Sequence, residues 1–360
     1  YIELQKRTGI DIEFIHPTVG SETEQFNLLL ASNDLPDLIE WSWATISGGP
    51  ASYIESGVIL PLNDAIKQWA PNLQRVLDEH PDAKVGAMLD DGTFSFFPGI
   101  YDVEHRHWLG PTIRSDLMEK FGITEYPETI ADWYDMLKKV KAGDPNMLPF
   151  TCRGKAQWDQ AELFMGAWGV RSAFYQDAGT VKYGPIEPGY KEFLAEMAKW
   201  YAEGLIDPEF PANTQAMTNE KNQKGLIFSQ PSAMGGDITL NTGLVRKSTN
   251  PDFTMMPVNF PVLNDGEKPA IGFTLPMIYG GGTIITTACD NVKEATKLMD
   301  YNYSEEGNLL GNFGIEGLSY DLVDGLPIYT DLIMKNPEGY DIASAISVYA
   351  YHSGNTRSEE

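Results

Sequence analysis

The chain has 360 residues, of which 42% are hydrophobic, and its 26 Lys and Arg against 51 Asp and Glu give a formal net charge of −25. A chain of this length usually divides into more than one core, so two lobes are expected. So acidic a surface repels nucleic-acid phosphates and anionic lipids, which argues against partners of either kind. No apolar run approaches 18 residues, so no membrane-spanning segment is predicted.

The first hundred residues alternate between extended and helical patterns. Residues 10–15 are expected to form a short strand, and the capping-box spacing of Ser21 and Glu24 predicts a helix after it. The next strand delivers Trp41 and Trp43 into a loop, and the two rings share one face if the segment is extended. This alternation indicates an α/β sheet, in which ligands gather at the carboxyl ends of strands.

The segment 97–117 is predicted to cross between the two lobes. The breaker pairs Pro-Gly at 98–99 and Gly-Pro at 110–111 prevent one continuous element there. Between them lie four polar and aromatic residues, Glu104, His105, His107 and Trp108. The two histidines have a spacing that metal ligands on a strand can use, but no third ligand can be named, so no metal is predicted. These residues are expected either to bind ligand or to hold the lobes in register.

The middle of the chain indicates a second α/β unit. Thr129, with Asp132 three residues later, caps a predicted helix. Trp158 and Trp168 stand ten residues apart on another predicted helix, so they cannot both line one cleft, and Trp158 is the favoured one. Asp237 follows two glycines at the end of a strand, where it could accept hydrogen bonds from ligand hydroxyls or cap the next helix.

The last third of the chain returns to a buried strand. Tyr279 lies beside the glycine run 280–282, which leads into that strand, and it is a weaker candidate for a ligand contact. A helix over residues 291–303 follows. Asp324 and Gly325 then have the sequence of a two-residue β-hairpin turn.

Signals of enzymatic chemistry are poor. The motifs GxSxG, HExxH, GxxxxGK[ST] and GxGxxG are missing, and Cys152 and Cys289 lie far apart without a CxxC motif. A glycoside hydrolase remains an alternative, because two carboxylates beside aromatic rings would also describe its site. We predict a protein that is not an enzyme and that needs no cofactor.

Several stretches resemble one family, in order along nearly the whole chain. They include LLLASNDLPDLIEW, GVILPLNDAI, DGTFSFFPG, PETIADWYDMLKKV and YKEFLAEMAKWYAEGLIDPEF. The chain is similar to the extracellular solute-binding proteins, family 1, of bacterial ABC importers, and within them to the LplA-like lipoproteins of Gram-positive bacteria. Members normally begin with a secretion signal and a lipobox cysteine and continue further, so truncation at both ends is expected.

The resemblance implies a two-lobed, periplasmic-binding-protein-like α/β fold of type II, with a mixed sheet flanked by helices in each lobe and hinge strands between them. Lobe 1 would comprise residues 1–108 and 272–313, and lobe 2 residues 109–271 and 314–360. The implied function is an extracellular receptor that captures an oligosaccharide between the lobes and delivers it to an ABC permease. It would be a monomer, tethered to the cell surface by a lipid anchor that this chain lacks. Peptides or other polar solutes remain alternative ligands.

The residues expected to contact ligand are aromatic rings, which cover the apolar faces of sugars, and polar groups, which bind hydroxyls. Each has a structural alternative, such as packing at a strand end or holding the hinge. The set is Trp41, Trp43, Glu104, His105, His107, Trp108, Trp158, Asp237 and Tyr279.

Overall fold

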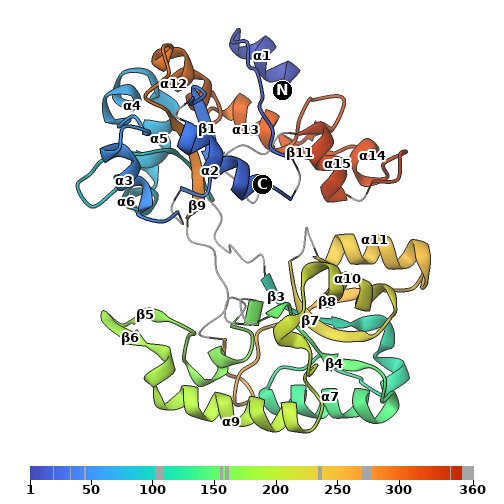
Figure 1. Ribbon diagram of the computed structural model, residues 1–360. Helices are drawn as coiled ribbons and strands as arrows, with labels where there is room; N and C mark the ends of the chain where they lie inside the picture. Colours follow the sequence, from blue (N-terminus) through green and yellow to red (C-terminus); the bar gives the residue numbers. More distant parts are fainter. Residues whose placement is uncertain are drawn as a thin grey trace. The chain divides into compact units, whose positions relative to one another are not determined.

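The chain forms two compact α/β units, which confirms the predicted fold class (Figure 1). Unit 1 comprises Tyr1–Arg106 and Leu275–Glu360, and unit 2 comprises His107–Thr274. Each unit has a sheet and a hydrophobic core of its own. The computed structural model describes residues 1–18, 20–32, 34–43, 46–101, 109–154, 157–158, 162–233, 237–269, 277–340 and 342–350.

Unit 1 is built on a three-stranded antiparallel sheet. Its central strand β9 (Ile278–Ile285) lies between β1 (Leu38–Trp41) and β2 (Phe97–Ile100). The hairpin of β10 (Tyr320–Val323) and β11 (Leu326–Tyr329) stands apart from this sheet. The helices are α1 (Ile2–Thr8), α2 (Glu22–Ser32), α3 (Gly49–Glu55), α4 (Asn63–Trp69), α5 (Pro71–Glu79), α6 (Pro81–Ala87), α12 (Val292–Tyr301), α13 (Glu305–Asn312), α14 (Asp331–Met334) and α15 (Ile342–Tyr349).

Two apolar clusters hold the sheet of unit 1 to its helices. One joins the sheet to α4, α5, α6 and α12, and its fully buried side chains include Leu62, Leu73, Phe97 and Ile285. The other surrounds the end of β1 and consists of Phe26, Ile39, Trp43, Ile59, Phe96 and Ile284. The second cluster fixes Trp43, two residues beyond the end of β1.

Unit 2 contains a four-stranded mixed sheet in the order β4-β7-β3-β8. Strands β4 (Leu148–Phe150) and β7 (Ile227–Ala233) are parallel, so their carboxyl ends meet at one edge. Strands β3 (Leu109–Arg114) and β8 (Met255–Pro257) complete the sheet in antiparallel pairings. Also present are the hairpin β5 (Phe174–Asp177) and β6 (Thr180–Tyr183), the helices α7 (Ile130–Gly143), α9 (Pro188–Ala202), α10 (Gln215–Gln223) and α11 (Thr239–Ser248), and short 3-10 turns at Ser115–Leu117, Glu119–Phe121, Met165–Trp168, Gly184–Ile186 and Phe210–Ala212.

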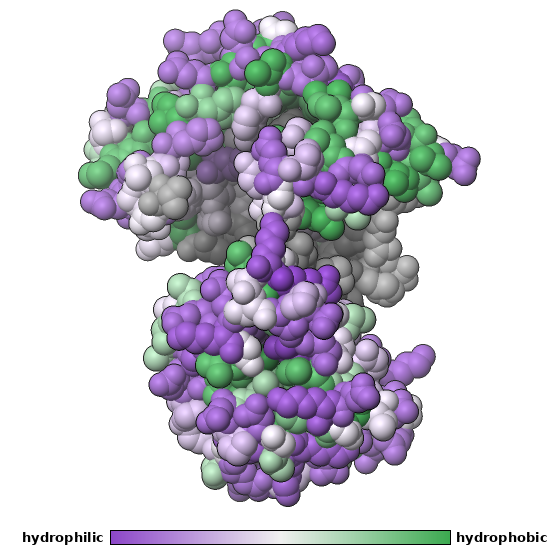
Figure 2. All heavy atoms as spheres, turned by 90° about the vertical axis from the view of Figure 1, so that its right-hand side faces the viewer, coloured by the Kyte–Doolittle hydropathy of each residue, from purple (hydrophilic) through white to green (hydrophobic). Residues whose placement is uncertain are grey.

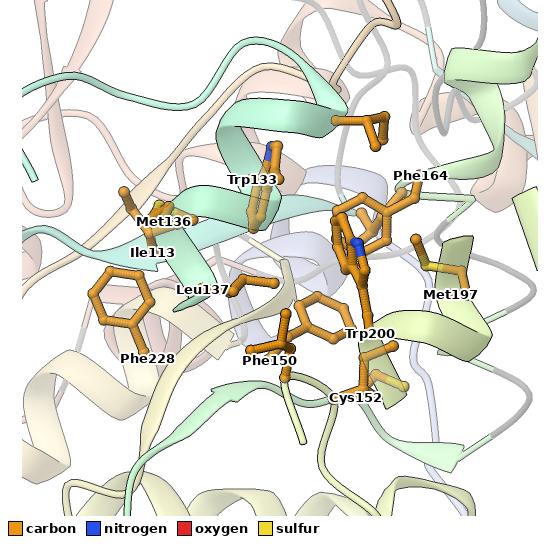
Figure 3. Packing of buried hydrophobic residues seen from close by; sticks show 14 of the residues in the cluster. Ile113, Trp133, Met136, Leu137, Phe150, Cys152, Phe164, Met197, Trp200 and Phe228 are labelled. Carbon is orange, nitrogen blue, oxygen red and sulfur yellow. The ribbon is translucent and has the colours of Figure 1, made fainter. Parts of the chain in front are cut away.

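The core of unit 2 is rich in aromatic rings (Figure 3). Helix α7 contributes Trp133, helix α9 contributes Trp200, and both rings are fully buried. Phe164 packs edge-on against each of them, with ring centroids 5.2 and 5.1 Å apart. The face of unit 2 seen in Figure 2 is mostly hydrophilic, with small hydrophobic areas.

Local sequence signals account for several of these elements. Helix α7 begins with the predicted capping box, in which the amide of Asp132 donates to Thr129 Oγ1 at 3.1 Å and the amide of Thr129 donates to Asp132 Oδ2 at 2.8 Å. Asp324 and Gly325 have φ values of 54° and 86° and form the predicted turn of the β10–β11 hairpin. The strand predicted for residues 10–15 is wrong, because that segment pairs with no other strand in the described residues.

The described residues after 313, which are 314–340 and 342–350, belong to unit 1. Ile315 lies against an apolar cluster of Leu4, Leu298 and Leu310, and the Tyr329 hydroxyl donates to the carbonyl oxygen of Asn312 at 2.8 Å. The division by packing therefore differs from the lobes expected from sequence, which put residues 314–360 in lobe 2.

Candidate functional site

The loop after β1 is anchored by Trp43. This side chain is fully buried, and its indole Nε1 donates to the carbonyl oxygen of Ile39 at 3.3 Å. Its ring meets Phe26 and Tyr53 edge-on, with centroids 5.5 and 5.9 Å apart. Trp43 is therefore a core residue and has no exposed surface to offer a ligand.

Trp41, the last residue of β1, is the partly exposed member of the pair. Its ring stacks on Phe26 with a centroid separation of 4.1 Å and an interplanar angle of 6°. Phe26 is itself buried, so the stack holds one face of the Trp41 indole against the core. A flat ring held in this way can cover the apolar face of a sugar ring without losing much side-chain freedom on binding.

Glycines of β9 let the backbone approach Trp41 closely. A Cβ on Gly281 would overlap the carbonyl oxygen of Trp41, and a Cβ on Gly282 would overlap that of Phe97. Gly282 is also the direct partner of Trp41 in the sheet. Gly281 is thus favoured by the end of β1 and Gly282 by the start of β2, because a Cβ at either position would overlap a backbone carbonyl oxygen unless the neighbouring strand moved.

Gly281→Ala is expected to lower the free energy of unfolding by about 1–3 kcal/mol, because β1 must move to make room for the methyl group. Urea unfolding followed by tryptophan fluorescence measures the loss. Gly110→Ala is the matched control, since its Cβ would lie 3.8 Å from the Phe260 ring, an ordinary contact distance. Equal stability of the two variants would contradict this reading of β9.

In unit 2, Arg153 and Asp237 meet beyond the carboxyl ends of β4 and β7. Arg153 Nη2 donates to Asp237 Oδ2 at 3.0 Å, and the amide of Ala233 donates to the same oxygen at 3.0 Å. Gln215 Nε2 donates to Asp237 Oδ1 at 3.1 Å. Both oxygens of the carboxylate are therefore engaged within the protein. Asp237 does not cap α11, whose N-cap position is held by Ile238.

Trp158 packs into the aromatic core of unit 2 and is partly buried. Its ring lies 5.3 Å from Phe210 and 6.1 Å from Phe150, measured between centroids. The cavity beside it has a volume of about 10 Å³, which is room for about one water molecule. This cavity cannot admit a sugar ring. Trp168 also packs against this core, edge-on to Phe193 at 5.8 Å.

Five of the predicted contacts cannot be placed. Glu104, His105, His107 and Trp108 lie outside the described residues, and so does the side chain of Tyr279, whose backbone belongs to β9. Their roles as ligand contacts stay predictions.

Neither a metal-ligand group nor a reactive thiol is present among the described residues. These residues contain no group of three His, Cys, Asp or Glu side chains that could hold a metal ion. Burial raises the pKa of the Cys152 thiol to about 12 and that of Cys289 to about 11, so both thiols are protonated at neutral pH. Within the described ranges, the helices are too short or too polar to cross a membrane.

Arg153 was missed by the sequence analysis. It lies three residues after β4, just as Asp237 lies four residues after β7, and both positions follow from the parallel pairing of these strands. The sequence signal for Arg153 is its position just after a strand end. It is neither aromatic nor acidic, and those were the residue types considered as ligand contacts.

The two α/β units are those of a type II solute-binding protein, because solved structures of that class match nearly the whole chain. The alginate-binding protein AlgQ2 without calcium ion matches with a TM-score of 0.78 and 26% identity, over 99% of this chain and 73% of that one. The Streptococcus pneumoniae protein FusA in complex with kestose shows the same fold, with a TM-score of 0.73 and 20% identity over the same shares.

The chain belongs to the bacterial extracellular solute-binding protein family, whose sequence profile matches residues 2–309. It is 30% identical over 339 residues to the fructooligosaccharide ABC transporter substrate-binding protein FusA of Streptococcus pneumoniae serotype 4, covering 87% of this chain and 59% of the relative. It is 24% identical over 360 residues to the lipoprotein LipO of Bacillus subtilis strain 168, covering 92% and 66%. The chain spans less than two thirds of either relative. These matches confirm the family predicted from sequence.

Proposed function

We propose that this chain is the solute-binding receptor of an ABC importer and that its ligand is an oligosaccharide. The observation that carries the proposal is the Trp41 ring, which Phe26 holds flat at the end of β1. Rings held in this way suit the apolar faces of sugars. The names of the relatives agree with this class, since FusA is a fructooligosaccharide-binding protein and AlgQ2 an alginate-binding protein.

The proposed mechanism is reversible binding without a chemical step. Units 1 and 2 act as the two lobes, and a ligand favours the closed state only through contacts that both lobes make in that state. Glu104, His105, His107, Trp108 and Tyr279 remain proposed contacts. The loaded receptor then docks on the permease of the importer. We propose that it is a monomer, tethered by a lipid at the surface of a Gram-positive cell.

Thermal unfolding of the purified chain against neutral oligosaccharides, alginate oligosaccharides and short peptides tests this function. A ligand at one hundred times its Kd adds about 2.7 kcal/mol to the free energy of unfolding and raises Tm by about two degrees or more. We expect that rise with an oligosaccharide recovered intact. A rise with peptides alone, or cleavage of the sugar, would contradict the proposal, and cleavage would identify a glycoside hydrolase.

A further inference from the structure

The Arg153 guanidinium is held in a fixed position at the carboxyl edge of the unit 2 sheet. The backbone amide of Arg153 donates to Gln157 Oε1 at 2.6 Å, and Gln157 Nε2 donates to the carbonyl oxygen of Pro231 on β7 at 3.4 Å. The side chain is held separately by Asp237. Both ends of Arg153 are therefore tied to β7 or to the segment after it, so a ligand that meets the guanidinium finds it already ordered.

The Asp237 carboxylate is in no position to bind a ligand itself. Its side chain is 8% exposed, and its two oxygens accept hydrogen bonds from Arg153, Ala233 and Gln215. The Arg153 side chain is 24% exposed and carries five N–H donors, of which the contact with Asp237 uses one. Among the described residues, its other side-chain donors have no acceptor. In this pair it is therefore Arg153 that can donate hydrogen bonds to a ligand.

The charge of the pair decides which ligands it suits. Asp237 compensates Arg153, so the pair offers donors with a formal charge of zero. The rest of the protein adds no positive field, because unit 1 has 30 Asp and Glu against 10 Lys and Arg, and unit 2 has 21 against 16. Neutral hydroxyl oxygens can accept from the guanidinium, whereas a sugar carboxylate meets no uncompensated cation here and is repelled by the surrounding charge.

We infer that Arg153 is a ligand-binding residue, that Asp237 is its positioning residue, and that this edge of unit 2 selects neutral oligosaccharides over those built from uronic acids. The inference rests on the proposed function and names the ligand class of the same receptor. It also gives Asp237 a different role from the hydroxyl acceptor expected from sequence.

Titration calorimetry of the whole chain tests the inference with kestose, raffinose and maltotriose as neutral probes and an alginate trisaccharide as the uronate probe. We expect the wild-type chain to bind at least one neutral trisaccharide about tenfold or more tightly than the alginate one. Arg153→Gln should raise the Kd for that sugar by about 10- to 100-fold, as expected for lost hydrogen bonds from a charged donor. Lys182→Gln, which removes a cation paired with Asp177 on the β5–β6 hairpin, is the matched control and should leave the Kd unchanged.

Asp237→Asn separates positioning from mere stabilisation of the fold. Because it leaves the charge of Arg153 uncompensated, it should shift the preference toward the alginate trisaccharide by about tenfold relative to the neutral sugar. Equal weakening for both probes would overturn the positioning role of Asp237.

A Kd for Arg153→Gln equal to that of Lys182→Gln would overturn the binding role of Arg153. A wild-type preference for the alginate trisaccharide would overturn the selection of neutral oligosaccharides. In each of those cases the receptor function stands, whereas a wild-type chain that binds no sugar contradicts both the function and this inference.

Discussion

Asp207→Ala is expected to lower the free energy of unfolding of unit 2 by about 3–5 kcal/mol, because it leaves the Lys221 ammonium largely buried without its main partner. The side chain of Asp207 is 1% exposed and that of Lys221 is 14% exposed. Asp207 Oδ2 accepts from Lys221 Nζ at 2.9 Å, from Asn213 Nδ2 at 3.0 Å and from Thr151 Oγ1 at 2.7 Å. One substitution therefore leaves three buried donors without this acceptor.

Urea unfolding monitored by tryptophan fluorescence measures this loss. The matched control is Asp177→Ala, which breaks the Lys182 ion pair on the β5–β6 hairpin. The Asp177 and Lys182 side chains are 55% and 33% exposed, so the control should cost about 1 kcal/mol or less. Similar losses in the two variants would contradict a structural role for the buried network.

The same carboxylate makes unit 2 sensitive to acid. Burial raises the pKa of Asp207, but the hydrogen bonds from Lys221, Asn213 and Thr151 together lower it by more, so its pKa in the folded protein lies below the ordinary value. The folded state then binds fewer protons than the unfolded state, and the stabilisation is present above the unfolded pKa of about 3.9. It is lost as the pH falls through the folded pKa.

Asp207→Asn should therefore differ in stability from the wild type most at neutral pH, and the difference should shrink below about pH 4. Denaturant unfolding at several pH values between 2 and 7 measures it. A difference that grows toward low pH would show that the sign of this linkage is wrong.

The second large effect separates the two tryptophans at the end of β1. Trp43→Ala should cost about 3–5 kcal/mol of unfolding free energy, because it empties a fully buried site in the core. Trp41→Ala should instead weaken oligosaccharide binding by about 2 kcal/mol, roughly thirtyfold in Kd, as for other aromatic residues that dominate a binding surface.

Calorimetric titration and urea unfolding of the two variants, done side by side, measure this division. Trp41→Ala removes a partly exposed ring that stacks on Phe26 at the margin of the apolar cluster around Trp43, so its stability should stay nearer to that of the wild type. If Trp41→Ala bound the sugar with unchanged affinity, the candidate site in unit 1 would be wrong.

The sequence predicted much of the fold because its strongest signals are local. Thr129 and Asp132 form a capping box whatever the helix packs against, and Asp324 with Gly325 forms its turn from backbone preferences alone. The packing of Ile315 in unit 1 depends instead on a contact between parts distant in sequence, that with the Leu4 cluster. No local pattern in the sequence reports such a contact.

The candidate site was harder to predict for the same reason. Trp41 and Trp43 would share a face only on an extended strand, and β1 ends at Trp41, so the Trp43 ring turns into the core. Asp237 could be found as an acid at a strand end. Its saturation by Arg153 and Gln215 required three segments far apart in sequence to come together.

The central claim is that this protein binds an intact oligosaccharide. Titration calorimetry of the whole chain with the sugar that raises Tm most, followed by mass spectrometry of the recovered sugar, tests it most directly. We predict saturable binding of one sugar per chain and a sugar of unchanged mass. Sugar fragments after incubation, or no heat of binding with any oligosaccharide that raised Tm, would contradict the claim.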